Sequence, residues 1–256
     1  MEHQLLGNIY VNNPMNITKP LINNKVDILA MSRHEIKYVL TKQQLNNIIQ
    51  FLSGHMKVDE YGKTSIASLY YDTADYRLVR TSIEKPEYKE KIRLRSYGLA
   101  SYDSRVFLEL KRKVSGYVYK RRIALKENEV NALFDNNYHE DQIAKEINYF
   151  TNFYQNLMPA FLIIYDRVAY FDPNSDLRLT LDLNPRYRIH DLNLHTSMEG
   201  ESLLEDEGAI LELKVQSSIP MWLSEFLSKN NIYQSSFSKV GEAYKKEMLK
   251  SVERKS

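Results

Sequence analysis

Several segments of the sequence alternate charged and apolar residues, and the charged positions combine carboxylates with lysines and arginines. Three segments place a glutamate two residues before a lysine: Glu35 before Lys37, Glu109 before Lys111, and Glu212 before Lys214. Residues two apart on a β-strand lie on the same face. If these faces converge, the cations could neutralise phosphate oxygens while the carboxylates hold a divalent ion through hard oxygen ligands.

The same alternation places further charged residues in phase with these pairs. They are Lys89, Lys91, Arg93, Arg95, Lys113, Lys120, Arg122, Arg178 and Asp182. Alternating strands ordinarily turn their charges to solvent, so the charged outer face of a sandwich is the alternative interpretation. Six strands share the pattern, and this favours faces that converge on one cavity. Their leucine-rich opposite faces would then need to be covered by helices.

Period-two alternation predicts the strands, and a spacing of three to four apolar residues predicts the helices. The predicted strands are 33–40, 65–72, 89–97, 105–113, 117–125, 161–170, 177–184 and 210–216. The predicted helices are 43–54 with Thr41 as N-cap, 127–136, 140–154, one from Pro220 to about Asn230, and one from Ser238 to about Val252. This order predicts an α+β, β-dominated fold: a closed or nearly closed antiparallel barrel or tunnel with helices packed outside.

Composition narrows the class of protein. The chain has 256 residues, with 35 basic and 33 acidic side chains and a formal net charge of +2, a small excess for a nucleic-acid binder. It contains no cysteine, which excludes disulfides and thiolate metal sites. No apolar run is long enough to span a bilayer. We therefore expect a cytoplasmic protein that binds no nucleic acid, with a loosely docked arm over residues 1–31 and one domain over 32–256.

Nine short motifs then occur in an order that resembles the VTC domain. They span Arg33–Tyr38, Ser68–Thr73, Tyr88–Gly98, Val106–Lys113, Tyr119–Arg122, Tyr165–Arg167, Arg178–Asp182, Ile210–Lys214 and Phe237–Lys239. The VTC domain is the catalytic domain of the eukaryotic vacuolar transporter chaperone complex, and its bacterial relatives are described as polyphosphate polymerases. It is part of the CYTH, or triphosphate tunnel metalloenzyme, superfamily. The resemblance covers residues 32 to about 250.

The resemblance implies a β-tunnel that binds the triphosphate of ATP with Mn²⁺ or Mg²⁺ and extends an inorganic polyphosphate chain. The implied catalytic, phosphate-contacting residues are Lys37, Arg93, Arg95, Lys111, Lys120, Arg167, Arg178 and Lys239. Substrate-binding residues in the same phase or motif are Lys89, Lys91, Lys113, Arg122, Lys214 and Ser238. The metal candidates are Glu212, then Glu109, Glu35 and Asp182. Ser238 and Lys239 open a predicted helix, whose free N–H groups favour an anion.

One position departs from the wider superfamily. Its hydrolase and cyclase branches begin with Glu-x-Glu-x-Lys, whereas Arg33 stands at the first position here, so the first strand offers only Glu35 as a carboxylate. This favours the polymerase branch. A (tri)polyphosphatase of the same fold, and a polyphosphate or nucleotide sensor without turnover, remain open alternatives. By analogy with the eukaryotic complex, a separately encoded membrane partner, and a place beside the inner face of a membrane, are compatible with the chain.

Overall fold

The computed structural model describes residues 34–115, 117–134, 142–216 and 218–253. Within them the chain forms one antiparallel sheet of ten strands, in the order β10-β1-β9-β7-β6-β2-β3-β4-β5, with β8 paired to β7. The strands are β1 (His34–Leu40), β2 (Lys57–Asp72), β3 (Tyr88–Tyr97), β4 (Arg105–Val114), β5 (Tyr117–Lys126), β6 (Met158–Phe171), β7 (Arg178–Arg188), β8 (Glu201–Ser202), β9 (Ala209–Val215) and β10 (Gln234–Ser235). The predicted arm and Arg33 lie outside the described residues.

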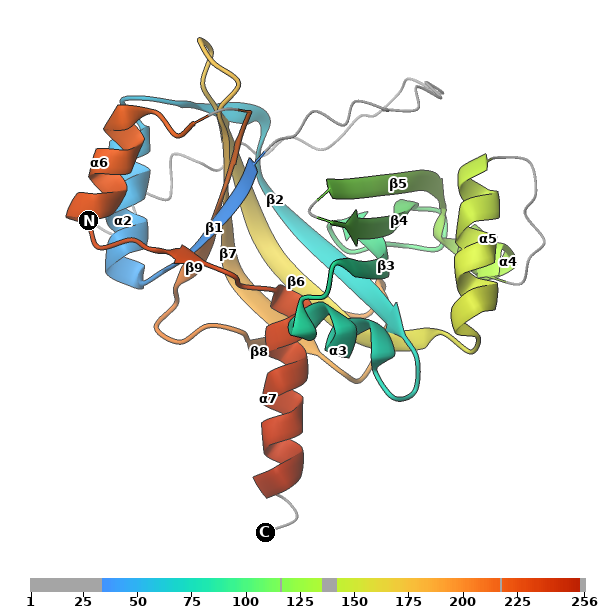
Figure 1. The fold of residues 1–256 in the computed structure, drawn as a ribbon. Coiled ribbons are helices and arrows are strands. Elements are labelled where there is room, and N and C mark those ends of the chain that lie inside the picture. The colour runs from blue at the N-terminus through green and yellow to red at the C-terminus, as the bar shows by residue number, and fades with distance from the viewer. Residues whose placement is uncertain (1–33, 116, 135–141, 217, 254–256) are drawn as a thin grey trace.

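The sheet curls until strands from its two ends approach each other. Figure 1 shows β1 and β9 on one side and β3, β4 and β5 on the other, with β2 and β6 running between them. The edge strands β10 and β5 share no ladder in the described part of the chain. A salt bridge of 3.8 Å between Lys111 on β4 and Glu35 on β1 spans the opening instead. The predicted tunnel-like antiparallel fold is confirmed, as a curled sheet whose edges are not hydrogen-bonded to each other.

Helices cover the apolar outer face of the sheet on both sides. On one side, α2 (Lys42–Leu52) and α6 (Met221–Lys229) pack on leucines of β7 and β9. On the other, α4 (Val130–Phe134) and α5 (Gln142–Tyr154) pack on β3 and β4, where Ile92, Leu108 and Leu110 are fully buried. Both pairs are visible in Figure 1. The leucines of the alternating strands therefore point outward and are covered by helices, and the charged residues point toward the inside of the curl.

Two further helices pack against the inner face. In α3 (Arg77–Glu84) and α7 (Lys239–Glu253), apolar side chains join a cluster that contains Ile66 of β2 and Ile163 and Tyr165 of β6. These residues are in phase with Arg167 along β6. Helix α7 lies below the curl in Figure 1, with its N-terminal end pointing toward the sheet. It closes the base of the inner face and brings Lys239 to it.

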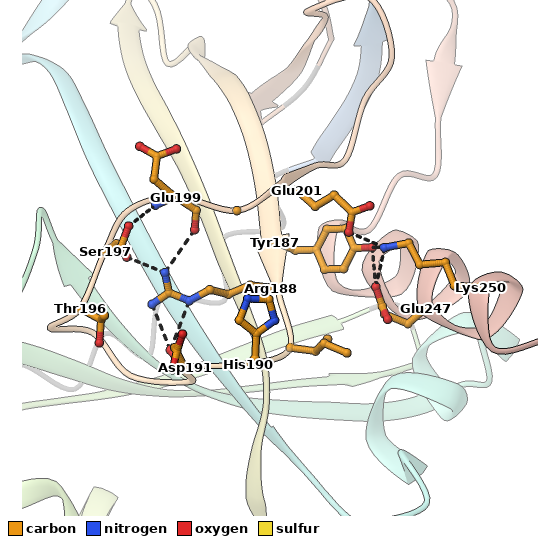
Figure 2. Close-up of a pocket in the computed structure, with 12 residues that line it drawn as sticks. Tyr187, Arg188, His190, Asp191, Thr196, Ser197, Glu199, Glu201, Glu247 and Lys250 are labelled. Atoms are coloured by element: carbon orange, nitrogen blue, oxygen red, sulfur yellow. Dashed lines mark hydrogen bonds and ion pairs between the residues drawn. The ribbon is translucent and has the colours of Figure 1, made fainter. Parts of the chain in front are cut away.

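The far half of α7 is held by a polar cluster beside a separate cavity. Lys250 binds Glu201, Glu247 at 2.9 Å, and the Tyr187 hydroxyl at 3.1 Å. Figure 2 shows this cluster next to Arg188, whose guanidinium donates to backbone carbonyls of the 189–200 loop. The cavity measures about 450 Å³, and none of the residues predicted to bind phosphate or metal lines it. The contacts of Lys250 hold α7 to the sheet, and those of Arg188 hold the loop.

Most predicted elements agree with the structure, with a few corrections. β2 begins at Lys57, earlier than predicted, because a bulge between Val58 and Lys63 interrupts the alternation. The predicted helix 127–136 is a 3₁₀ turn, Glu127–Glu129, followed by the short helix α4; residues 135 and 136 lie outside the described part. The helix α3 and the two-residue strands β8 and β10 were not predicted. No helix in the described residues is long and apolar enough to span a membrane.

The unpredicted helix α3 depends on a buried carboxylate. Asp72, 4% exposed, accepts hydrogen bonds from the backbone N–H groups of Leu78 at 2.8 Å and Val79 at 2.9 Å in the first turn. It also accepts from the Thr73 N–H at 2.9 Å. These N–H groups have no partner within the helix, so a carboxylate that lies well before the helix in sequence replaces the usual N-cap.

Removing this carboxylate should destabilise the fold. We expect Asp72→Ala to lower the free energy of unfolding by about 2 kcal/mol, since it leaves several backbone donors without an acceptor. Asp72→Asn keeps one acceptor and should lose about half as much. Urea denaturation measures both. The matched control is Asp103→Ala, an exposed carboxylate paired with Lys126, which should change stability by less than about 0.5 kcal/mol. Equal stabilities of Asp72→Ala and the control would contradict this assignment.

Candidate functional site

The carboxylate of Glu109, on β4, is surrounded by cations from the two neighbouring strands. It lies opposite Arg93 on β3 and Arg122 on β5, and is 1% exposed. Its oxygens lie 2.8 Å from Arg93, 3.7 Å from Arg95, 2.9 Å from Lys120 and 3.2 Å from Arg122. Burial opposes its ionisation, but Arg93, Arg95 and Lys120 outweigh burial and lower the pKa of Glu109 to about 2. A single negative charge therefore positions four cations, which leaves the group with an excess of positive charge.

A second buried carboxylate, Asp182, joins the sheet to α7. Arg167 donates from Nε to Oδ1 at 2.6 Å and from a terminal nitrogen to Oδ2 at 2.9 Å, and Lys239 binds Oδ2 as well. Burial opposes ionisation of Asp182, yet Lys239 and Arg167 hold its pKa well below the usual range. The Lys239 ammonium also lies 4.5 Å from the centre of the Tyr165 ring, whose hydroxyl is 3.4 Å from Arg95. Tyr165 thus connects the Asp182 group to the Glu109 group.

A third group of charges lies on β1 and β9. Glu212 contacts Lys214 at 3.0 Å and Lys37 at 3.6 Å, and Lys37 also contacts Glu35 at 3.1 Å. Burial opposes ionisation of Glu212, but the two lysines and Arg167 lower its pKa to about 2. The carboxylates in turn outweigh burial at Lys37 and raise its pKa. Three carboxylate-centred groups therefore form one network across the inner face.

Lysines face one another toward one end of β3 and β4. In the strand register Lys89 lies opposite Lys113 and Lys91 opposite Lys111, which in turn lies opposite Lys120. Like charges in direct cross-strand pairs destabilise a sheet. Neither Lys89 nor Lys113 has an ion pair within the described residues, whereas Lys91 donates to the Ser238 hydroxyl at 3.1 Å. Burial, with Lys111, Lys37 and Arg93, lowers the pKa of Lys91 to about 8. This end of the inner face therefore favours a polyanion.

The structure brings the predicted site residues to this inner face. Arg178 lies on this face too, at its rim: it is exposed at the start of β7, opposite Lys214, and has no ion pair in the described part of the chain. Two tyrosines belong to the site without having been predicted: Tyr165, and Tyr70, whose hydroxyl accepts from Arg93 at 2.8 Å. Burial opposes ionisation of Tyr70, but Arg93, Lys91 and Arg95 lower its pKa to about 8. Tyr70 shares its side of β2 with Ser68, and this period-two position was the sequence signal that could have placed it in the site.

The described residues hold no group of three or more Asp, Glu or His side chains suited to a metal ion. Two carboxylates, Glu35 and Glu212, lie on either side of Lys37. Thr180 lies opposite Glu212, and its buried hydroxyl oxygen has no hydrogen-bond partner among the described residues. Mg²⁺ in phosphate sites takes one or two carboxylates and completes its shell with phosphate oxygens and water. These three oxygen-bearing side chains fit an ion of that kind.

The comparisons with known proteins identify the family. Residues 32–248 match the VTC domain. The chain belongs to the VTC domain family. The resemblance stated from the nine motifs is thereby confirmed. A search of curated proteins finds no match to the sequence.

Solved structures share the fold at low sequence identity. A Bacillus halodurans protein with a provisional adenylate cyclase name has a TM-score of 0.52 and 16% identity, over 80% of this chain and 92% of its own. A Vibrio parahaemolyticus protein with the same provisional name has a TM-score of 0.43 and 11% identity, over 83% and 97%. A conserved hypothetical protein from Pyrococcus furiosus has 0.36 and 12%, over 77% and 86%. The first supports the tunnel fold of this VTC domain and nothing further.

The lowered pKa of Lys91 predicts how anion binding by the VTC domain depends on pH. Lys91 is protonated below about pH 8 and loses its charge above it. Because an anion binds the protonated form, tripolyphosphate affinity should fall by about tenfold between pH 7 and 9. Lys91→Arg stays charged throughout and should flatten this fall. Titration calorimetry at pH 7, 8 and 9 measures both proteins.

Tyr70 also titrates in this range, and it gains a negative charge as the pH rises. A Tyr70→Phe variant separates the two effects: it should retain the part of the slope that Lys91 causes. Identical pH slopes in the wild type and Lys91→Arg would contradict the role given to Lys91.

The charge excess around Glu109 predicts a ligand-dependent stability. Glu109→Gln keeps the shape but leaves its cations without a counterion, and should cost about 3 kcal/mol of stability. Tripolyphosphate replaces the missing charge, so it should raise the melting temperature of this variant more than that of the wild type. Thermal unfolding with and without tripolyphosphate measures the difference.

The matched control is Glu90→Gln, on the same sheet. Glu90 is also buried and binds Arg112 at 2.9 Å, but it lies in the opposite phase of β3. The Glu90→Gln substitution should destabilise the domain, but tripolyphosphate should raise the melting temperature of this variant as much as that of the wild type. Equal ligand-induced shifts in all three proteins would show that Glu109 does not balance charge in the ligand site.

Proposed function

We propose that this VTC domain transfers the γ-phosphoryl group of ATP to the end of an inorganic polyphosphate chain. Membership of the family and the tunnel fold support a function in phosphoryl chemistry. The observation that carries the finer proposal is the row of facing lysines on β3 and β4. The cations that the three buried carboxylates hold would be enough to neutralise a nucleoside triphosphate. The row of opposed lysines lies beyond them and is suited to an extended chain of phosphates.

The proposed reaction requires alignment and charge neutralisation more than proton transfer. A terminal oxygen of the acceptor chain attacks the γ-phosphorus, and the bond from the γ-phosphorus to the β,γ-bridging oxygen breaks, which releases ADP. The acceptor oxygen is already ionised at neutral pH, so no general base is needed. Arg93, Arg95 and Arg167, held by Glu109 and Asp182, are placed to offset the charge of the transferring group and the departing ADP.

The four predicted metal carboxylates divide into two roles in this proposal. Glu109 and Asp182 act as counterions that position arginines and lysines, because they are almost completely buried and arginines bind their oxygens directly, whereas Glu212 is more exposed and contacts lysines only. Glu212, with Glu35, would hold Mn²⁺ or Mg²⁺. When bound, such an ion supplies a Lewis acid that neutralises phosphate oxygens. Lys37, which lies between the two carboxylates, would turn toward phosphate in that state.

The deciding experiment incubates the purified protein with ATP and Mn²⁺, with Mg²⁺ in parallel, and resolves the products by gel and ³¹P NMR. The proposal expects a ladder of long polyphosphate with stoichiometric ADP. Orthophosphate without chains, especially from tripolyphosphate, would instead make the domain a hydrolase. Tight polyphosphate binding without turnover would make it a sensor. Either result would overturn the polymerase proposal.

Glu212 separates catalysis from anion binding. We expect Glu212→Ala to lower kcat by at least about 100-fold, because the metal carboxylate is lost. Its tripolyphosphate affinity in the absence of metal should be equal to the wild type or higher, since one negative charge leaves the site. The matched control is Glu225→Ala, an exposed glutamate of α6, which should leave both values unchanged. A Glu212→Ala protein with wild-type kcat would exclude Glu212 as the metal carboxylate.

A further inference from the structure

The two ends of the inner face differ in chemistry along β3 and β4. Toward Lys89 and Lys113 the face carries only lysines. Toward the opposite end it carries aromatic rings: Tyr97 closes β3, and Phe107 lies two residues before Glu109 on β4. The rings of Tyr97 and Phe107 meet edge to face, with centroids 5.7 Å apart. Arg105 also lies at this end, with its guanidinium 5.7 Å from the centre of the Phe107 ring, but the register of β3 and β4 places no two cations opposite each other there.

A cavity of about 570 Å³ opens at the aromatic end. Its walls come from β2, β3, β4 and β6, and its apolar lining includes Ile66, Tyr97, Phe107 and Ala169. Hydroxyl and carboxylate groups of Thr64, Ser104 and Asp59 also line it. A cavity of this size with a mainly apolar lining and a few polar groups is typical of a small-molecule site. Inorganic polyphosphate has no apolar surface to place in it.

The cavity is continuous with the charged network. Arg167, which binds Asp182, also lines the cavity. Arg122 lies 3.8 Å from the centre of the Phe107 ring, donates to the Tyr97 hydroxyl at 2.9 Å, and contacts Glu109 at 3.2 Å. One guanidinium therefore touches both aromatic walls and the central carboxylate. A ligand with an aromatic part in the cavity and an anionic part beyond it would pass directly from one environment to the other.

We propose that this cavity binds the nucleoside of ATP, with the base on Tyr97 and Phe107 and the triphosphate extending along β4 toward Glu109. The inference rests on the proposed function, which supplies ATP as the donor. Phe107 and Glu109 are two residues apart, about 7 Å along the strand, so the phosphates reach the arginines as they leave the cavity. The ribose lies near the polar groups Thr64, Ser104 and Asp59. The acceptor chain then occupies the lysine end, and the two substrates meet between Arg93 and Lys111.

The test compares the affinities of ATP and inorganic tripolyphosphate, measured by titration calorimetry without metal. In the wild type, the affinity for ATP should be higher than its negative charge alone would predict from the affinity for tripolyphosphate. Tyr97→Ala removes one wall, and Ala169→Phe fills the cavity without altering a charge. Each should weaken ATP binding by about tenfold, the effect of losing one aromatic stacking surface, and change tripolyphosphate binding by less than about twofold.

Two control variants make the result specific. Tyr97→Phe keeps the ring but loses the hydroxyl that contacts Arg122, and should keep ATP affinity within about threefold of the wild type. Tyr149→Ala removes an exposed ring on α5 and should change neither ligand. Circular dichroism and thermal unfolding establish that each variant is folded, and Ala169→Phe and Tyr97→Ala test the same cavity independently.

The outcomes distinguish this inference from the function on which it rests. If Tyr97→Ala and Ala169→Phe weaken both ligands equally, or weaken neither, the nucleoside does not bind in this cavity and the inference is wrong. In that case tripolyphosphate binding to the wild type would still support the proposed function. If the wild type binds neither ligand, the proposed function itself fails, and the inference with it.

Discussion

The site depends on a small number of carboxylates that are shared among many cations. Taking a lysine or arginine out of water is costly unless an anion and hydrogen bonds compensate it. Glu109, Asp182 and Glu212 provide that compensation, but each is shared among two or more cations. The shared carboxylates fix the positions of the cations while leaving them positively charged in sum. An anionic ligand therefore completes an electrostatic balance that the protein leaves incomplete, which is the usual trade of stability for binding.

The fold makes this interior possible by reversing the usual direction of a two-faced sheet. The leucines of β3, β4, β7 and β9 point outward and are buried by α2, α5 and α6, so the hydrophobic core surrounds the charged face. The curl then brings β1 and β4, which are far apart in the sheet order, within ion-pair distance. Helix α7 contributes Lys239 from its first turn, held by Asp182. Two of the three apolar clusters thus lie outside the charged face, and the third packs α3 and α7 against it.

Period-two alternation predicted the strands and the inner face because it is local: Leu177–Asn184 or Lys89–Tyr97 reveals its two faces without knowledge of its neighbours. Features that depend on contacts distant in sequence could not be predicted this way. Helix α3 is capped by Asp72, which lies before it and outside any capping motif. Tyr70 reads as a core residue until Arg93 is seen to donate to its hydroxyl. Likewise, the different roles proposed for Glu109 and Glu212 rest on burial and on which cations contact each carboxylate, which residue type does not reveal.

Arginines and lysines differ along the face in a way that would suit the proposed polyphosphate substrate, which must be held at one point and released along its length. The arginines remain charged at any working pH, and Arg93, Arg95 and Arg167 are fixed by carboxylates, so they present a rigid set of donors. Lys89, Lys91 and Lys111 have lowered pKa values because burial and neighbouring cations both disfavour their charged forms. The charged form of these lysines is therefore less favourable than that of a lysine in water. In the proposed reaction, the rigid arginines would hold the reacting phosphates, and the lysines would bind the chain that advances by one phosphate in each cycle.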